Sequence, residues 1–333
     1  MGAAHAELPL AWIAERVGAA RATPAKSIQS LWSGYGEIRR VKLMGGSVEN
    51  VVVKCVTPPD VQRHPRGWSS DASHQRKLRS YDVECAFYEQ FAPRCTEVCR
   101  VPRCYGVQRL DDPAGWLIVL EDLDAAGYAG RRSSVSNAHV EQCLVWLAEF
   151  HATFLGAEPN RLWPIGTYWH LATRADELAV VADPRLKRVA PLLDAQLNAC
   201  TFQTLVHGDA KLANFCFGAR GVAAVDFQYV GGGAGIKDVA YFFSSCWDGQ
   251  ECERLAPRFL DRYFELLQER LRAKRPDLDA RTRERVEAEW RQLYPVAWAD
   301  FCRFLAGWAP EHWKLHVYSR GLLERVLGEF ESG

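Results

Sequence analysis

Two aspartates and one asparagine form the pattern in this sequence that best fits a chemical reaction. Asp209 and Asn214 lie five positions apart, and Asp226 follows the short apolar run of residues 222–225. Phosphoryl transfer from a nucleotide uses one carboxylate to orient the attacking hydroxyl group, and a second carboxylate and an amide to hold magnesium ions. Because Asp and Asn are each common in turns, it is their order and spacing together that predict this chemistry.

Two lysines extend the pattern. Lys54 follows the β-branched run of residues 51–53, where a kinase places the lysine that contacts the α- and β-phosphates. A lysine that protects a sheet edge from aggregation would give the same pattern. Lys211 lies two positions after Asp209, where an ammonium group would offset charge developing on the transferred phosphate; a solvated loop lysine fits equally well. We predict Asp209 and Lys211 as catalytic residues, and Asn214 and Asp226 as magnesium ligands.

Three segments resemble a known family: HGDAKLANFCF at residues 207–217, VDFQ at residues 225–228 and KDVAYFF at residues 237–243. They resemble the phosphotransferases of the aminoglycoside kinase and choline kinase superfamily, over roughly residues 34–243. The Asp-Phe-Gln form resembles its ecdysteroid-kinase-like, or CHK-kinase-like, group. The resemblance implies a bilobal protein-kinase-like fold, ATP and Mg²⁺ as cofactors, and the hydroxyl group of a small molecule as acceptor. Relative to the kinase pattern HRDxxxxN, Gly208 replaces the arginine.

The resemblance also implies six nucleotide-binding residues in the first part of the chain. Two glycines would form the turn that covers the phosphates, although the third glycine of the kinase loop is missing. A lysine and a helix glutamate would pair beside the phosphates, and the insertion of residues 58–80 accounts for the long interval between them. Backbone groups of two hinge residues would contact the adenine edge. These pairs are, in order, Gly34 and Gly36, Lys54 and Glu84, and Glu121 and Leu123.

The elements that must position these residues follow from the hydrophobic periodicity. In the first third of the chain, the pattern predicts one helix at residues 75–91 and strands at residues 37–43, 51–56, 104–108 and 116–120. In the remainder it predicts helices at residues 140–155, 185–199 and 254–275 and another that begins at residue 282. A β-rich insert is predicted at residues 202–227. The fold class is therefore α+β. We expect a small β-rich N-lobe at residues 1–122, which binds nucleotide, and a larger helical C-lobe at residues 123–333, which carries the catalytic and metal-binding loops and the acceptor site.

Three further features are given structural interpretations. His207 is predicted to hold the catalytic loop through a ring contact with the backbone, and Asp238 to cap a helix and support the metal-binding loop. The segment of residues 231–235 is predicted to be too rich in glycine for a fixed helix or strand. It would then form either a flexible flap or a loose turn.

Composition and charge limit the class of protein. The 333 residues include 41 basic and 41 acidic side chains, so a broad surface for nucleic acid or anionic membrane is not expected. The 11 scattered cysteines favour free thiols in a reducing compartment. The start of the chain lacks the basic and apolar regions of a signal peptide, and no apolar run is long enough to span a bilayer. A cytoplasmic location is therefore expected, and the oligomeric state is left open.

Two other functions are weighed against a small-molecule kinase. A catalytically inactive, nucleotide-binding sensor or scaffold would share the fold, but every expected metal and base residue is present. A protein kinase is disfavoured by Gly208 and because no Ala-Pro-Glu segment follows Asp226. The acceptor is undetermined. An acidic cluster would favour a cationic acceptor, and Glu251, Glu253 and Asp261 either form one or lie on the solvated face of a helix.

Overall fold

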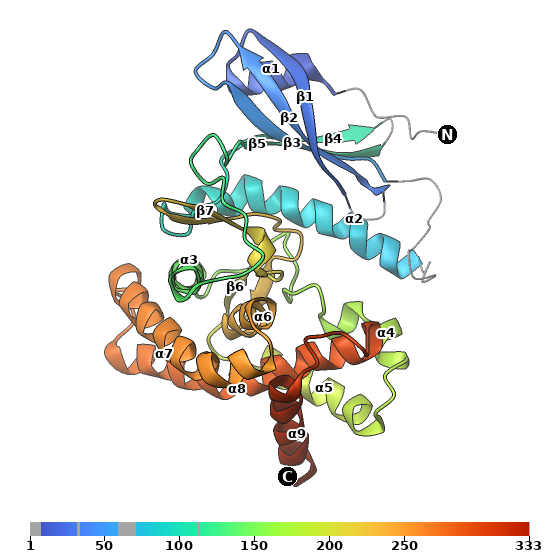
Figure 1. Ribbon diagram of the computed structural model, residues 1–333, viewed down its shortest axis with the longest axis vertical. Helices are drawn as coiled ribbons and strands as arrows, with labels where there is room; N and C mark the ends of the chain where they lie inside the picture. The colour runs from blue at the N-terminus through green and yellow to red at the C-terminus, as the bar shows by residue number, and fades with distance from the viewer. Residues whose placement is uncertain (1–7, 32–33, 59–70, 112–113, 333) are drawn as a thin grey trace. The chain divides into compact units, whose positions relative to one another are not determined.

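The computed structural model describes residues 8–31, 34–58, 71–111 and 114–332, and the chain divides into two compact units. Residues 1–94 and 101–130 belong to the first unit, and residues 95–100 and 131–333 to the second. The first unit is built on an antiparallel sheet, whereas the second is mainly helical (Figure 1). The predicted α+β class is confirmed.

Five strands form the sheet of the first unit in the order β1-β2-β3-β5-β4. Their bounds are β1 Arg21–Ser30, β2 Gly36–Met44, β3 Asn50–Val56, β4 Cys104–Asp111 and β5 Ala114–Glu121, so the four predicted strands correspond to β2 to β5. Val51 and Val53 of β3 and Val119 of β5 are fully buried in the core on one face of the sheet. Burying such a side chain contributes about 1.5–3 kcal/mol, which fixes the register of β3, the strand that carries Lys54.

Two elements at the start of the chain differ from the prediction. A short helix, α1 (Leu10–Val17), packs Ile13 and Ala14 into the core of the sheet, and β1 follows it. Gly18 ends α1 in the left-handed conformation, with φ of 72°. The prediction of a single helix in the first third is wrong, because α1 precedes the predicted helix. That helix is α2 (Asp71–Ala86), which continues as a π-helical turn at Phe87–Phe91. Residues 59–70 of the predicted insertion lie outside the described residues.

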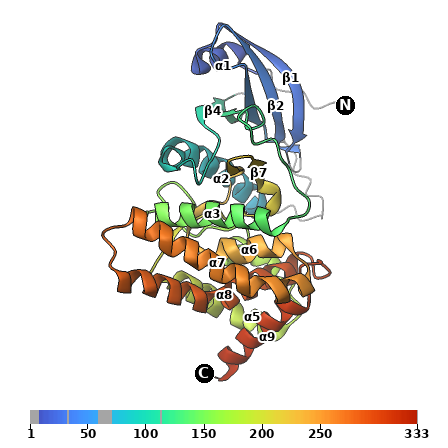
Figure 2. The same cartoon turned by 60° about the vertical axis from the view of Figure 1, so that its left-hand side comes forward.

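Helices make up most of the second unit. The long ones are α3 Asn137–Phe154, α5 Pro184–Asn198, α6 Ile236–Cys246, α7 Gly249–Lys274, α8 Ala280–Trp308 and α9 Val317–Ser332, and α4 Ala175–Ala179 is a single short turn. Figure 2 shows α3, α7 and α8 lying one above another. Asp248 begins α7 with a capping box that includes Glu251. Among the described residues, no helix has both the length and the apolar character needed to cross a membrane.

Short strands lie among these helices and carry the polar loops. β7 (Phe215–Gly218) pairs with β8 (Gly221–Ala224), and β6 (Thr204–Val206) pairs with β9 (Gly231–Gly233). The prediction that residues 231–235 cannot hold a fixed strand is therefore wrong. A Cβ atom on Gly231 would lie 2.2 Å from the carbonyl oxygen of Trp163. Glycine is needed in β9 because of this close approach, so it does not indicate a flap.

All 11 cysteines are free thiols, as the sequence predicts. No disulfide bond joins any of the 11, all of which lie in the described part of the chain. Eight of them are buried, including Cys143, Cys252 and Cys302. Burial raises the pKa of the Cys302 thiol to about 12, which keeps it protonated at neutral pH.

Candidate active site

The loop that carries Asp209 is held by the carboxylate of Asp238. Asp238 lies in the first turn of α6, and its oxygens accept the backbone N–H groups of His207 at 2.6 Å and Gly208 at 3.0 Å. Hydrogen bonds to a buried carboxylate are about twice as strong as neutral ones. The prediction that Asp238 caps a helix is wrong, because α6 begins after Gly235 with no side-chain cap. Asp238 instead fixes the backbone immediately before Asp209.

His207 has the predicted structural role. Its Nδ1 accepts the backbone N–H of Asp209 at 3.2 Å, and its Nε2 lies 3.1 Å from the carbonyl oxygen of Val225. Because Nδ1 acts as an acceptor, Nε2 must carry the proton, and its N–H donates a hydrogen bond to the carbonyl oxygen of Val225. The fully buried ring therefore links the loop of Asp209 to the segment that leads into Asp226.

The local backbone geometry requires a glycine at position 208. Its φ is 78°, in the left-handed region, and a Cβ atom there would lie 2.0 Å from the carbonyl oxygen of Tyr229. Side chains other than glycine are disfavoured both by the backbone and by this contact. The arginine of the protein-kinase pattern does not fit at this position.

Three side chains surround the Asp209 carboxylate, which is only 8% exposed. Lys211 Nζ lies 2.7 Å from Oδ2, and Asn214 Nδ2 donates to the same oxygen at 3.1 Å. The hydroxyl group of Tyr241 donates to Oδ1 at 3.1 Å. The structure thus brings together Asp209, Lys211 and Asn214, all selected from the sequence. It adds Tyr241 of α6, which was not among the residues predicted to act in the reaction.

Asp226 lies beside this group. Its backbone φ is +70°, an uncommon conformation for a residue other than glycine, and Gln228 Nε2 donates to its Oδ1 at 2.5 Å. Burial lowers the pKa of Lys211, but the charges of Asp209 and Asp226 raise it by more, so that the net shift is upward. Both carboxylates therefore act on one ammonium group, and Lys211 stays protonated at neutral pH.

The donor set fits a magnesium ion. Mg²⁺ prefers oxygen ligands, and Asp226 offers a carboxylate. Asn214 uses its amide nitrogen to contact both the backbone oxygen and Oδ2 of Asp209, at 2.8 and 3.1 Å, which makes Oδ1 the amide atom suited to a metal. The backbone oxygen of Asn214 accepts the N–H of Val225 at 3.0 Å, so the two candidate ligands belong to directly connected segments.

In the first unit, Lys54 and Glu84 form a buried ion pair. Lys54 Nζ lies 2.6 Å from Glu84 Oε2, and the two side chains are 5% and 1% exposed. Lys54 comes from β3 and Glu84 from α2, so the sheet and the helix are joined at this point. The pairing inferred from the sequence is present in spite of the long insertion between the two residues.

The other residues predicted to bind nucleotide lie at two places in the first unit. Gly34 precedes β2 and Gly36 is its first residue, where a Cβ atom would lie 2.1 Å from the carbonyl oxygen of Cys55. Glu121 and Leu123 are at the end of β5. The N–H of Glu121 donates to Arg103, and the carbonyl oxygen of Leu123 accepts from Tyr128, both at 2.8 Å. The contacts of these two residues with an adenine edge stay a prediction.

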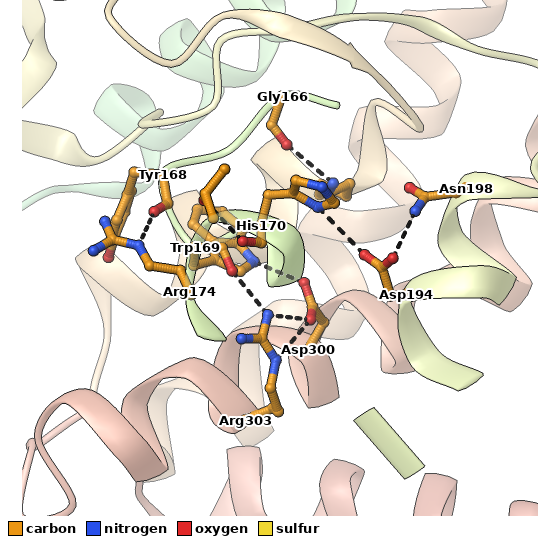
Figure 3. A network of polar contacts seen from close by, with 11 residues as sticks. Gly166, Tyr168, Trp169, His170, Arg174, Asp194, Asn198, Asp300 and Arg303 are labelled. Carbon is orange, nitrogen blue, oxygen red and sulfur yellow. Dashed lines mark hydrogen bonds and ion pairs between the residues drawn. The ribbon is translucent and has the colours of Figure 1, made fainter. Parts of the chain in front are cut away.

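A segment that the sequence did not single out supports the catalytic loop. Tyr168 donates its backbone N–H to the carbonyl oxygen of Gly208 at 3.1 Å. Figure 3 shows how the segment is anchored: Asp300 accepts the indole N–H of Trp169 at 3.0 Å and the Arg303 guanidinium at 2.6 Å, and Arg303 also donates to the carbonyl oxygen of Trp169 at 2.8 Å. These partners come from α8, far along the chain.

The three acidic residues considered for a cationic acceptor have other partners. Glu251 accepts the backbone N–H of Asp248 at 3.2 Å in the capping box of α7. Asp261 is exposed and pairs with Arg291 at 2.7 Å, and Glu253 is exposed on the same helix. The interpretation as a solvated helix face is therefore supported over an acidic acceptor site.

Solved structures share this fold at low sequence identity. A candidate aminoglycoside phosphotransferase from Ralstonia eutropha JMP134 has 12% identity and a TM-score of 0.52, covering 96% of this chain and 93% of its own. A candidate fructosamine-3-kinase from Thermobifida fusca YX-ER1 has 16% identity and a TM-score of 0.50, covering 98% and 99%. These likenesses confirm the predicted protein-kinase-like fold.

Sequence comparison assigns the family. No curated protein matches the chain significantly. The sequence profile of the phosphotransferase enzyme family APH matches residues 61–276, a span that includes Glu84, Asp209, Asn214 and Asp226. Because this span is more than half of the chain, the protein belongs to the phosphotransferase enzyme family.

Proposed function

We propose that the protein transfers the γ-phosphate of ATP to a hydroxyl group of a small molecule. The observation that carries the proposal is the arrangement around Asp209, with Lys211 at 2.7 Å and Asn214 at 3.1 Å from the same carboxylate oxygen. Family membership supports phosphotransferase chemistry on small molecules. The finer placement in the ecdysteroid-kinase-like group rests on the Asp226-Phe227-Gln228 form alone and stays a prediction.

In the proposed reaction, Asp209 orients the acceptor hydroxyl and takes its proton. A bond forms between the hydroxyl oxygen and the γ-phosphorus, the bond from that phosphorus to the bridging oxygen breaks, and ADP leaves with the electron pair. Lys211 stabilises the charge on the transferred group, because a fixed ammonium needs no reorganisation during the reaction. Asn214 and Asp226 would hold Mg²⁺, which when bound neutralises charge on the nucleotide phosphates.

Nucleotide binding is assigned to the first unit. Lys54, oriented by Glu84, would contact the α- and β-phosphates, and the turn of Gly34 and Gly36 would cover them. The adenine edge would meet the backbone at residues 121–123. In this proposal residues 1–122 act as the nucleotide-binding lobe, and residues 123–333 supply the catalytic loop, the metal ligands and the acceptor site.

The test is transfer of labelled γ-phosphate from Mg²⁺–ATP to a panel of hydroxylated small molecules. Asp209→Asn should greatly reduce transfer, whereas a change of Asp261, an exposed aspartate on α7, to Asn should leave it unchanged. Nucleotide binding with no transfer to any acceptor would instead support a sensor or scaffold. Labelling of a denatured proteome would support a protein kinase. Failure to bind Mg²⁺–ATP would contradict all three.

A further inference from the structure

A buried lysine, Lys314, lies in the loop between α8 and α9. Lys314 is 8% exposed, and its backbone is fixed by bonds to His312 and Ser319. Within the part of the chain that the structure describes, no hydrogen bond or ion pair involves its Nζ atom. An ammonium group has three N–H donors, and burying it without a partner is costly. Such a cost is unusual at a position with no function.

Aromatic rings account for only part of this environment. Lys314 Nζ lies 4.6 Å from the ring centroid of Tyr241, 5.4 Å from that of Phe301 and 5.7 Å from that of Trp313. Cation–π contacts of this kind stabilise the positive charge by about 0.5–2 kcal/mol. They do not provide the oxygen acceptors that the ammonium donors require.

Tyr241 connects this lysine to the proposed catalytic carboxylate. Its ring lies against Lys314 Nζ, and its hydroxyl group donates to Asp209 Oδ1 at 3.1 Å. The pKa of Lys314 is lowered to about 8, chiefly by burial, while the charge of Asp209 raises it and that of Lys211 lowers it. Asp209 and Lys211 are therefore within electrostatic range of Lys314.

Apolar side chains surround Tyr241 and Lys314. Tyr168 packs edge-on against Tyr241 at 5.5 Å and Phe304 at 5.4 Å, and the exposed side chain of Trp313 immediately precedes Lys314 in the loop. Tyr241, Phe301 and Phe304 belong to one apolar cluster. Tyr241, which contacts Asp209, therefore lies between aromatic rings and the positive charge of Lys314.

We propose that Lys314 binds an anionic group of the acceptor, so that the substrate is an alcohol carrying a carboxylate or phosphate group. This inference rests on the proposed function, since it places the acceptor hydroxyl at Asp209. The ammonium group of Lys314 would donate to the anionic oxygens and gain the partners it lacks. Charge-assisted bonds of this type are shorter and stronger than neutral ones. A cationic acceptor would be repelled by both Lys314 and Lys211.

The test measures binding by calorimetry to the protein saturated with Mg²⁺ and a non-hydrolysable ATP analogue. The probes are hydroxyalkyl and hydroxy(phenyl)alkyl compounds that end in a carboxylate, a phosphate, a carboxamide or an ammonium group on the same skeleton. We expect at least one anionic series to bind at least tenfold more tightly than its carboxamide. The carboxylate and phosphate arms identify which anion is preferred.

Lys314→Met should remove this preference and leave the affinity for the ATP analogue unchanged. The control is Lys187→Met, because Lys187 lies on α5 and its Nζ donates to the carbonyl oxygen of Ala179 at 2.7 Å. The inference is overturned if no anionic probe binds more tightly than its carboxamide, or if Lys314→Met binds the anionic probes as the unmodified protein does. Phosphate transfer is scored separately, so that transfer to neutral alcohols alone would contradict the inference but support the proposed function.

Discussion

The carboxylate of Asp238 accepts the backbone N–H of His207 at 2.6 Å, and both side chains are fully buried. The contact joins the first turn of α6 to the loop that presents Asp209. The buried Asp238 carboxylate orients the backbone of His207 and Gly208 and takes no direct part in phosphate transfer. Asp238 is therefore a positioning residue, and its loss should affect turnover more than nucleotide binding.

We predict that Asp238→Asn lowers the turnover of ATP by about ten- to a hundredfold and the free energy of unfolding by about 1.5–3 kcal/mol. The asparagine keeps one acceptor oxygen, but its amide group faces an N–H donor. Steady-state phosphate release and urea unfolding provide the two measurements, with Asp261→Asn as an exposed control. A loss of ATP affinity with unchanged turnover would contradict the positioning role.

The ion pair of Lys54 and Glu84 should contribute both to ATP affinity and to the free energy of unfolding. Breaking a buried pair by removing one partner costs about 3–5 kcal/mol, because the other charge remains buried. We expect Lys54→Met and Glu84→Gln each to weaken ATP binding, with the larger loss for Lys54→Met. Calorimetric titration with ATP measures the affinity. If Lys54→Met binds ATP as tightly as the unmodified protein, the lysine is structural only.

The double variant of Lys54→Met and Glu84→Gln separates stability from binding. Without either charge, the unfolding free energy should recover toward that of the unmodified protein, since no unpaired charge remains. ATP binding should not recover. Recovery of both properties would mean that the pair has no direct contact with the nucleotide.

Gly208→Ala should be strongly destabilising. The new Cβ would lie 2.0 Å from the carbonyl oxygen of Tyr229, at a backbone φ of 78°. We expect a loss of about 2 kcal/mol or more in unfolding free energy, because both the conformation and the contact are unfavourable. The matched control is Gly127→Ala, where φ is also positive at 92° but nothing lies within 4 Å of the new Cβ. Equal losses in the two variants would contradict the steric explanation.

The buried positive charge of Lys314 should lower the free energy of unfolding at neutral pH. Its pKa is lowered from 10.5 to about 8, so the unfolded chain binds more protons than the folded protein between these values. Stability should therefore rise as the pH increases from about 8 to 10.5. Lys314→Met should be more stable than the unmodified protein at pH 7, by on the order of 1–3 kcal/mol. Asp209, Lys211 and Cys246 also act on this charge and remain in the variant.

The measurement for Lys314 is urea unfolding of both proteins at pH 7 and pH 10. Their difference should be largest at pH 7 and smaller at pH 10, because at pH 10 Lys314 of the folded protein is almost entirely neutral. A variant that is less stable than the unmodified protein at pH 7 would show that the aromatic contacts outweigh the cost of burial. Together with weaker binding of anionic probes, a more stable variant would show that the site keeps an unfavourable charge for function.

The sequence predicted those parts of the site that depend on local patterns. The β-branched run before Lys54 and the helical spacing around Glu84 placed both residues on the correct elements. Asp209 and Asn214, five positions apart, likewise lie in a single loop, in which Asn214 Nδ2 donates to the backbone oxygen and Oδ2 of Asp209. Such features need no knowledge of how distant segments pack.

Other features could not be predicted, because distant segments determine them. Gly231 is a buried strand residue that pairs with Val206, and the close approach of the Trp163 carbonyl oxygen requires glycine there. Lys314 comes from a loop after α8, and nothing near it in the sequence relates it to Asp209. Asp238 was assigned to a helix cap on local grounds, whereas its hydrogen bonds go to the loop of His207.

The most direct test of the proposed phosphotransferase activity is single-turnover transfer of labelled γ-phosphate with purified protein, Mg²⁺ and the panel of alcohols. We predict transfer to a small-molecule hydroxyl group, reduced by about a hundred- to ten-thousandfold in Asp209→Asn while ATP affinity is retained. Asp261→Asn should transfer at the unmodified rate. Transfer by Asp209→Asn at the rate of the unmodified protein would contradict the proposed role of this carboxylate.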